Sequence, residues 1–84
     1  MFTGIIETVG EVEQIKKEGN NIIFTIKSKI SSELKIDQSL SHDGVCLTVV
    51  EKTESTHSVV AIKETSLKSN VKEWKVGTLI NLER

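Results

Sequence analysis

Apolar and polar residues alternate along most of this chain, which is the pattern of β-strands that bury one face. The segment 22–27 is the clearest case, because Ile22, Phe24 and Ile26 fall on one face of an extended chain. Ile23 interrupts the alternation, which predicts a strand partly covered on both sides. Similar patterns predict six strands in all, over residues 7–17, 22–27, 38–41, 45–51, 58–63 and 79–83.

Turn-forming residues separate these segments. Gly19-Asn20-Asn21 predicts a hairpin and Asp43-Gly44 a second tight turn, because Gly, Asn and Asp tolerate a positive φ. Gly77 predicts a third turn, before the last strand. Around Gly10 the alternation becomes ragged, which predicts either a β-bulge or a close approach of the backbone.

Only two stretches have a helical pattern. Residues 31–34 predict a single capped turn. In residues 65–74, Leu67, Val71 and Trp74 form one amphipathic stripe, which predicts a helix of one or two turns. We detect no internal repeat. Several short, regularly spaced strands predict an all-β fold, a closed antiparallel barrel, because closure removes exposed strand edges.

Composition narrows the class of protein. The chain has 84 residues, which predicts one domain over residues 1–84 with a core so small that an oligomer or a ligand is expected to add stability. Cys46 is the only cysteine, which excludes an internal disulfide and suits a reducing, cytoplasmic compartment. The net charge is −1 with Lys and Glu interspersed, so no basic surface for nucleic acid is predicted.

Other classes find no support in the sequence. No apolar run approaches the roughly 18 residues needed to span a bilayer, and the segment 1–6 lacks the basic start of a secretory signal. His and Cys do not occur at the spacing of metal ligands. We also find no carboxylate pair, phosphate-binding glycine loop or catalytic triad.

The segment 39–49 is the most informative part of the chain. Its polar turn leads directly into a β-branched, apolar strand whose small polar residues, Cys46 and Thr48, are two positions apart. Because strand side chains alternate between faces, these two residues share one face, and Leu47 and Val49 point to the other. The strand therefore has an apolar face for a core and a mildly polar face that a flat ligand could use.

Each candidate residue also has a plain structural interpretation. Cys46 could be a small buried apolar residue or could face a pocket, where its thiol would contact a ligand. Thr48 could serve only as a β-former or as a hydrogen-bond donor. His42, placed in a turn, is expected to be solvated, and could instead carry protons near neutral pH. Ser39 is most simply a hydroxyl at a turn or strand edge.

Four landmarks together resemble the N-terminal lumazine-binding barrel of the riboflavin synthase family, in order and at natural spacings over all 84 residues. The central stretch Asp43-Gly44-Val45-Cys46-Leu47-Thr48-Val49 resembles that family's Asn-Gly-x-Cys-Leu-Thr-Val signature. The other three are Met1-Phe2-Thr3-Gly4-Ile5-Ile6, Lys63-Glu64-Thr65, and Gly77 with Asn81-Leu82-Glu83-Arg84. Asp43 departs from the signature, which usually has Asn. Both residues suit a turn, but the added charge could alter contacts with a neighbouring subunit.

The resemblance implies a six-stranded Greek-key barrel that is the N-terminal half of a two-barrel enzyme, without the C-terminal barrel. In the family each barrel binds one 6,7-dimethyl-8-ribityllumazine, and a catalytic site forms between barrels of two subunits in a trimer. One lumazine passes a four-carbon unit to the other there, which yields riboflavin and a ribitylamino-pyrimidinedione, with no required cofactor. For this chain alone we expect ligand binding, little or no turnover, and a homodimer.

Matching positions imply which residues form the site. Phe2, Ser39, His42 and Cys46 match the segments nearest the reacting rings. The residues implied to line the ligand are Gly4, Ile5, Ile6, Cys46, Leu47, Thr48, Val60, Ala61, Ile62, Lys63, Glu64 and Thr65. Two alternatives remain open: a non-catalytic lumazine or flavin carrier of the same superfamily, and a ligand-free barrel that serves only assembly.

Overall fold

The computed structural model describes residues 6–63, 65 and 70–84. Within these residues it contains six strands and two short 3₁₀ segments. They are β1 (Thr8–Glu18), β2 (Asn21–Lys27), η1 (Ser31–Glu33), β3 (Ser39–His42), β4 (Val45–Lys52), β5 (Thr56–Ala61), η2 (Asn70–Glu73) and β6 (Leu79–Glu83).

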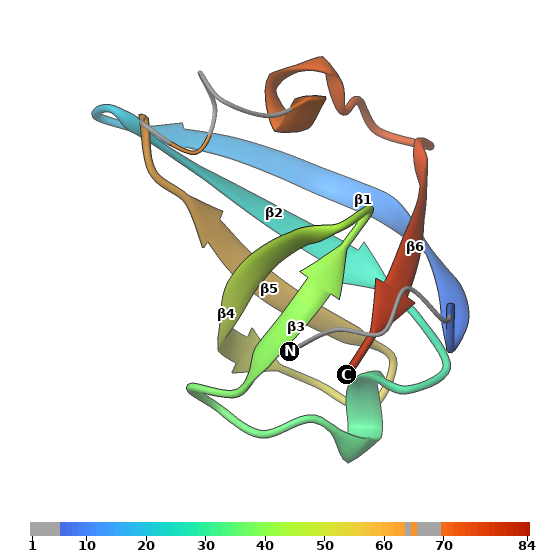
Figure 1. The fold of residues 1–84 in the computed structure, drawn as a ribbon. Helices are drawn as coiled ribbons and strands as arrows, with labels where there is room; N and C mark the ends of the chain where they lie inside the picture. Colours follow the sequence, from blue (N-terminus) through green and yellow to red (C-terminus); the bar gives the residue numbers. More distant parts are fainter. Residues whose placement is uncertain (1–5, 64, 66–69) are drawn as a thin grey trace.

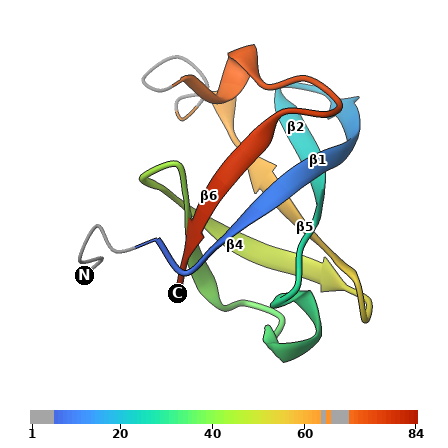
Figure 2. The same cartoon turned by 90° about the vertical axis from the view of Figure 1, so that its right-hand side faces the viewer.

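The strands close into one antiparallel barrel in the order β1-β2-β5-β4-β3-β6 (Figure 1). Hairpins join β1 to β2, β3 to β4 and β4 to β5, whereas β2 pairs with β5 and β3 with β6 across long connections. This order confirms the predicted closed, six-stranded Greek-key barrel. η1 and η2 lie at opposite ends of the barrel (Figures 1 and 2).

The core is one cluster of inward-facing side chains to which all six strands contribute. Leu34 and Trp74, which directly follow η1 and η2, are buried in the same cluster. The Trp74 ring meets the edge of Phe24 at a centroid distance of 5.0 Å, a favourable arrangement for two aromatic rings. The alternation in residues 22–27 is confirmed, because Phe24 and Ile26 are buried while Ile23 is half-buried on the other face.

The predicted turns are present. The β3–β4 hairpin is closed by Asp43 and Gly44 at φ 52° and 85°. Two successive positive φ angles in a two-residue loop make a type I′ turn, whose twist matches that of the strands it joins. Gly19 closes the β1–β2 hairpin at φ 63°. The sequence was therefore sufficient to place both hairpins.

Gly10 marks a close approach rather than a bulge. The register shift on β1 lies between Val12 and Gln14. A Cβ atom at Gly10 would lie 2.7 Å from Ile26 Cγ2 and 2.9 Å from a methyl group of Leu82. Only glycine leaves room for these two core side chains, which explains the ragged pattern.

Three predicted elements differ in detail from the structure. β5 spans Thr56–Ala61, so the prediction of 58–63 began and ended two residues late. The polar loop predicted between residues 51 and 58 is shorter than expected, because Thr56 and His57 already belong to β5 and pair with Lys27 and Ile26. The single turn at residues 31–34 is confirmed as η1, but without a side-chain cap. Of the predicted helix 65–74, the structure describes Thr65, which is helical, and residues 70–74, which contain the 3₁₀ segment η2. Leu67 lies outside the described residues.

The barrel is an internal duplication, which corrects our expectation of no repeat. Val12 on β1 accepts a hydrogen bond from Gly77 N at 2.7 Å, and Val49 on β4 accepts one from Asp37 N at 2.8 Å. Asp37 and Gly77 both have positive φ, at 72° and 95°. Each half of the chain therefore contains the same unit of hairpin, 3₁₀ segment and returning strand.

The two units share their detailed contacts. Lys35 N is bonded to the Gln38 side chain and Lys75 N to the Thr78 side chain, each at 2.9 Å. A register shift follows Val12 on β1 and Val49 on β4. A pseudo-two-fold axis thus relates β1 to β4, β2 to β5 and β3 to β6. The segments 33–37 and 73–77 share only Glu and Lys, so the sequence conceals the repeat.

Candidate functional site

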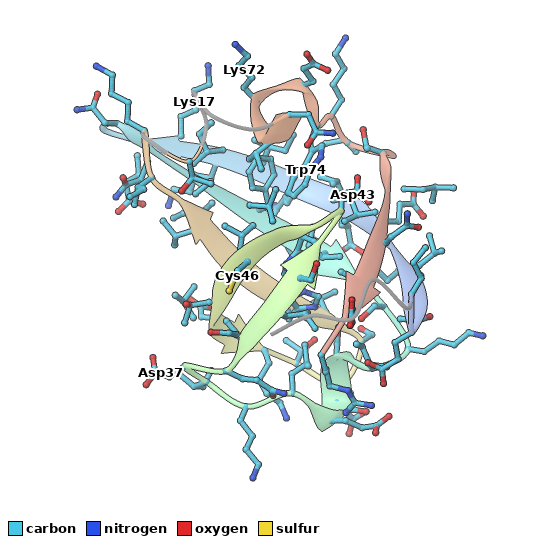
Figure 3. All side chains as sticks on the ribbon, in the orientation of Figure 1. Lys17, Asp37, Asp43, Cys46, Lys72 and Trp74 are labelled. Atoms are coloured by element: carbon cyan, nitrogen blue, oxygen red, sulfur yellow. The ribbon has the colours of Figure 1, made fainter. Side chains whose placement is uncertain are left out.

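The outer face of β3 and β4 has the small polar character that the sequence predicts. Cys46 and Thr48 are exposed, whereas Leu47 and Val49 between and beyond them are buried. Figure 3 shows Cys46 on β4, and its exposure contradicts the interpretation of this cysteine as a buried apolar residue. Ser39 lies directly opposite Thr48 in the β3–β4 ladder and is also exposed.

The seam between β4 and β5 is paired over only part of its length. Its ladder runs from Val49–Val59 to Lys52–His57, so residues 46–48 and 60–62 lie beyond it. Val60 is half-buried and Ala61 buried, and both Ile62 and Lys63 are exposed. The seam thus brings predicted ligand-lining residues of two strands to one part of the barrel, and their binding role stays a prediction.

Among the described residues, one predicted ligand-lining residue lies away from this seam. Ile6 is exposed and lines a different cavity of about 590 Å³ with Ser41, Asp43 and neighbouring residues of β6. Thr65 is half-buried after β5. Phe2, Gly4, Ile5 and Glu64 lie outside the described residues.

Asp43 has a defined structural task at the β3–β4 turn (Figure 3). Its Oδ1 accepts a hydrogen bond from Asn81 N at 2.7 Å, and its own N–H donates to the Asn81 carbonyl at 2.8 Å. The side chain therefore locks the turn onto β6. An Asn carbonyl could accept the same bond, which explains why both residue types suit this position.

His42 is not the solvated turn residue that the sequence predicts. It is the last residue of β3, its side chain points into the barrel, and it is fully buried. His57 on β5 is equally buried, and the two Nε2 atoms are 3.0 Å apart. A role of His42 in proton transfer to a ligand stays a prediction, and its surroundings give it a structural task.

Hydrogen bonds around the histidine pair fix both tautomers. His42 Nδ1 lies 2.9 Å from the Leu40 carbonyl, so it carries a proton and leaves Nε2 as an acceptor. His57 must then donate from Nε2 to His42 and accept at Nδ1 from the Ser31 hydroxyl, 3.0 Å away. Ser28 Oγ, 2.8 Å from Ser31 Oγ, completes the chain. Two neutral imidazoles satisfy every ring nitrogen.

Burial lowers the pKa of both imidazoles from 6.5 to about 4. The loss of hydration opposes a charge on His42, and the Leu40 carbonyl offsets only part of this effect. Loss of hydration also dominates at His57, and repulsion by a charged His42 lowers its pKa further. Both rings are therefore neutral near pH 7. Sequence reasoning missed His57, although it shares the buried phase of β5 with Val59 and Ala61.

No helix in the described part of the chain is long and apolar enough to cross a membrane.

Comparison with known proteins connects the barrel to one family. The model of the lumazine binding domain matches residues 3–84. Riboflavin synthase of Bacillus subtilis is 39% identical over the whole chain, and that of Saccharomyces cerevisiae is 36% identical. The chain spans 40% and 39% of the lengths of these two relatives.

Solved structures agree with this assignment. LumP complexed with riboflavin superposes with a TM-score of 0.89 at 25% identity, over 99% of this chain and 46% of that one. LumP complexed with 6,7-dimethyl-8-(1′-D-ribityl) lumazine reaches a TM-score of 0.90 at 24% identity, over 99% and 48%, which shows a shared fold. With its closed barrel, its duplicated topology and a family match over nearly its whole length, this chain belongs to the lumazine binding domain family.

Proposed function

We propose that this chain binds 6,7-dimethyl-8-ribityllumazine and riboflavin as the N-terminal barrel of a two-barrel riboflavin synthase. The observation that carries the proposal is the exposed, small polar face of β4 beside its unpaired seam with β5. The family match and the relatives named riboflavin synthase support it. So do the LumP complexes with lumazine and riboflavin.

The seam supplies both kinds of contact that a flat heterocycle needs. Residues 46–48 and 60–62 lie beyond the β4–β5 ladder, so main-chain groups facing the seam can pair with the pyrimidine edge of the ring. The Thr48 and Ser39 hydroxyls face the same side and can bond ring or ribityl oxygens. Cys46 offers a small side chain beside which the ring can lie.

Orientation is the main catalytic contribution that we propose for this barrel. The lumazine C7 methyl is acidic because its carbanion delocalises into the ring, so no metal or added cofactor is required. Holding two lumazines face to face can account for about 7–11 kcal/mol of a barrier in favourable cases. A four-carbon unit then passes from one lumazine to the other, which gives riboflavin and the ribitylamino-pyrimidinedione.

Replacing Thr48 by valine tests the seam directly. We expect Thr48→Val to weaken riboflavin binding by about 1–3 kcal/mol, because an isosteric side chain leaves a buried ligand group without its hydroxyl partner. Quenching of riboflavin fluorescence measures the affinity, and thermal unfolding checks the fold. Thr8→Val, on β1, is the matched control and should bind normally. Equal affinities of the two variants would remove Thr48 from the site.

These 84 residues by themselves are expected to bind ligand without effective turnover, because they form one barrel and the proposed catalytic site needs two. We expect riboflavin formation at least about 100-fold slower than in a protein that carries both barrels. We further propose that the isolated barrel pairs as a homodimer, that the two-barrel protein is a trimer, and that both are cytoplasmic. Robust riboflavin formation by the 84-residue chain would contradict the expected lack of turnover. A monomer in sedimentation equilibrium would contradict the proposed homodimer.

A non-catalytic carrier of lumazine or flavin is the second candidate. The structures of LumP with lumazine, riboflavin and flavin mononucleotide favour it, because they show that this fold is found in proteins with such ligands bound. A carrier would bind the same ligands at the seam but form no riboflavin even as a two-barrel protein. Steady-state riboflavin formation by that protein separates the two functions.

A further inference from the structure

A second groove lies on the far side of the barrel from the β4–β5 seam, along β1, β2 and the start of β6. Figure 2 faces β1 and β6, two of the strands that form it. Its cavity of about 380 Å³ is lined by Val9, Gly10, Glu11, Lys27, Ser28, Lys29, Ser55 and Leu79. None of these residues belongs to the proposed lumazine site.

This groove is the pseudo-two-fold counterpart of the seam. The matching pairs Val12–Ile26 and Val49–Val59 fix the correspondence of β1 with β4 and of β2 with β5. Residues 9–11 then occupy the positions of residues 46–48. Residues 27–29 occupy those of residues 60–62.

The remaining two lining residues obey the same relation. Leu79 pairs with Glu11 as Ser39 pairs with Thr48. Ser55 O accepts a bond from Ser28 N at 3.1 Å, in the place where Ile22 pairs with Ala61. The lining of this groove therefore occupies the same backbone positions as the residues of the seam, but with different side chains and with Glu11 and Lys27 paired where Thr48 and Val60 are not.

The second groove combines apolar surface with positive charge. The side chains of Val9 and Leu79 are large apolar groups that remain 49% and 66% exposed. Lys27 and Lys29 replace the apolar residues of the seam, and both are exposed. The groove contains one carboxylate, that of Glu11, which is the cross-strand neighbour of Lys27. Two lysines and one glutamate leave the groove with a net positive charge.

Within the described part of the chain, neither Lys27 nor Lys29 forms an ion pair or a side-chain hydrogen bond. The ion pairs found there join Lys16 to Glu18, and Arg84 to Glu7 and Glu33. Two ammonium groups without partners beside exposed apolar side chains suit a ligand that has an apolar ring and an anionic group.

We propose that this groove is a second ligand site, which takes a phosphate monoester of a flat aromatic heterocycle. The ring would lie on Val9 and Leu79, and the phosphate would contact the ammonium groups of Lys27 and Lys29. The seam on the opposite side carries one exposed lysine, Lys63, in place of two, and it is proposed to hold the ring that riboflavin and flavin mononucleotide share. The proposal goes beyond the function proposed above, since it concerns different strands and a different ligand charge.

Flavin mononucleotide and riboflavin form a matched pair of probes, because they share one ring and differ in the phosphate. Isothermal titration should show one more binding event for flavin mononucleotide than for riboflavin. Raising the salt concentration should weaken that extra event, because screening acts on exposed charges. In amide NMR spectra the extra event should shift residues 9–11 and 27–29. The riboflavin event should shift residues 46–48.

The double variant Lys27→Gln, Lys29→Gln should lower the affinity of the extra event at least about tenfold and leave the riboflavin event unchanged. Lys16→Gln, Lys17→Gln removes the same charge at the far end of β1 and should change neither. Equal numbers of events for both flavins would overturn the proposal, as would amide shifts confined to β4 and β5. Loss of the riboflavin event alone would count only against the seam.

Discussion

Lowering the pH from 7 to 4 is expected to destabilise this barrel by a few kcal/mol, because the buried His42–His57 pair binds protons less readily in the folded state than in the unfolded chain. The unfolded chain binds protons at its histidines near pH 6.5, whereas the folded pKa of each is about 4. Stability is therefore complete above pH 6.5 and is lost as the pH falls through this window. The loss is a large share of what a small domain possesses.

Urea unfolding at a series of pH values, followed by circular dichroism, measures this loss. The duplication supplies a control, because Leu82 and Phe24 occupy the pseudo-two-fold positions of His42 and His57, and both are buried. The double variant His42→Leu, His57→Phe copies that apolar pair. We expect its stability to change little between pH 6.5 and 4. An equally steep loss in the variant would exclude the histidines as its cause.

The Glu7–Arg84 ion pair responds to pH in a lower range than the histidine pair. Hydrogen bonds from Arg84 lower the pKa of Glu7 below its usual 4.5. Any stability from this exposed pair is present above pH 4.5 and is lost as the pH falls through the lowered value. The histidine window therefore precedes it during acidification, and the double variant should retain the Glu7 transition.

Truncating Trp74 to alanine is expected to cost about 3–5 kcal/mol, the range for a buried aromatic side chain. Trp74 is 5% exposed and packs on Phe24. Its Nε1–H, however, is buried and has no hydrogen-bond partner among the residues that the structure describes. An unsatisfied buried donor is destabilising by about 1–3 kcal/mol, so the indole stabilises the barrel only through its packing.

Trp74→Phe separates these two effects. It keeps an aromatic ring against Phe24 and removes the unsatisfied donor, so we expect it to cost at most about 2 kcal/mol. Denaturation must be followed by circular dichroism, because Trp74 is the only tryptophan. If Trp74→Phe were as destabilising as Trp74→Ala, the indole nitrogen would have a partner that this structure does not show.

Local patterns were sufficient for most of the fold. Alternation identified all six strands, and residues 79–83 were bounded correctly. The start of β5 was missed because Thr56 and His57 resemble the polar loop before them. Their strand conformation depends on pairing with β2, a contact that no local pattern expresses.

The candidate site likewise has some features that follow from local sequence patterns and others that depend on tertiary contacts. That Cys46 and Thr48 share one face followed from alternation alone, whereas the exposure of Cys46 is shown by the structure. His42 was misplaced because it stands directly before a turn, where histidine is usually solvated. Its burial depends on β3 closing the barrel against β6, and its partner His57 comes from a strand on the other side of β4.

The sequence by itself determined the strands, the type I′ turn at Asp43-Gly44 and the small polar face of β4, because each depends on neighbours within a few residues. The tertiary structure alone decided which strands pair, that two histidines meet in the core, and that the chain contains one hairpin unit twice. These features depend on register between residues far apart in the chain. The two halves also differ at most matched positions, so the duplication is visible only in the backbone.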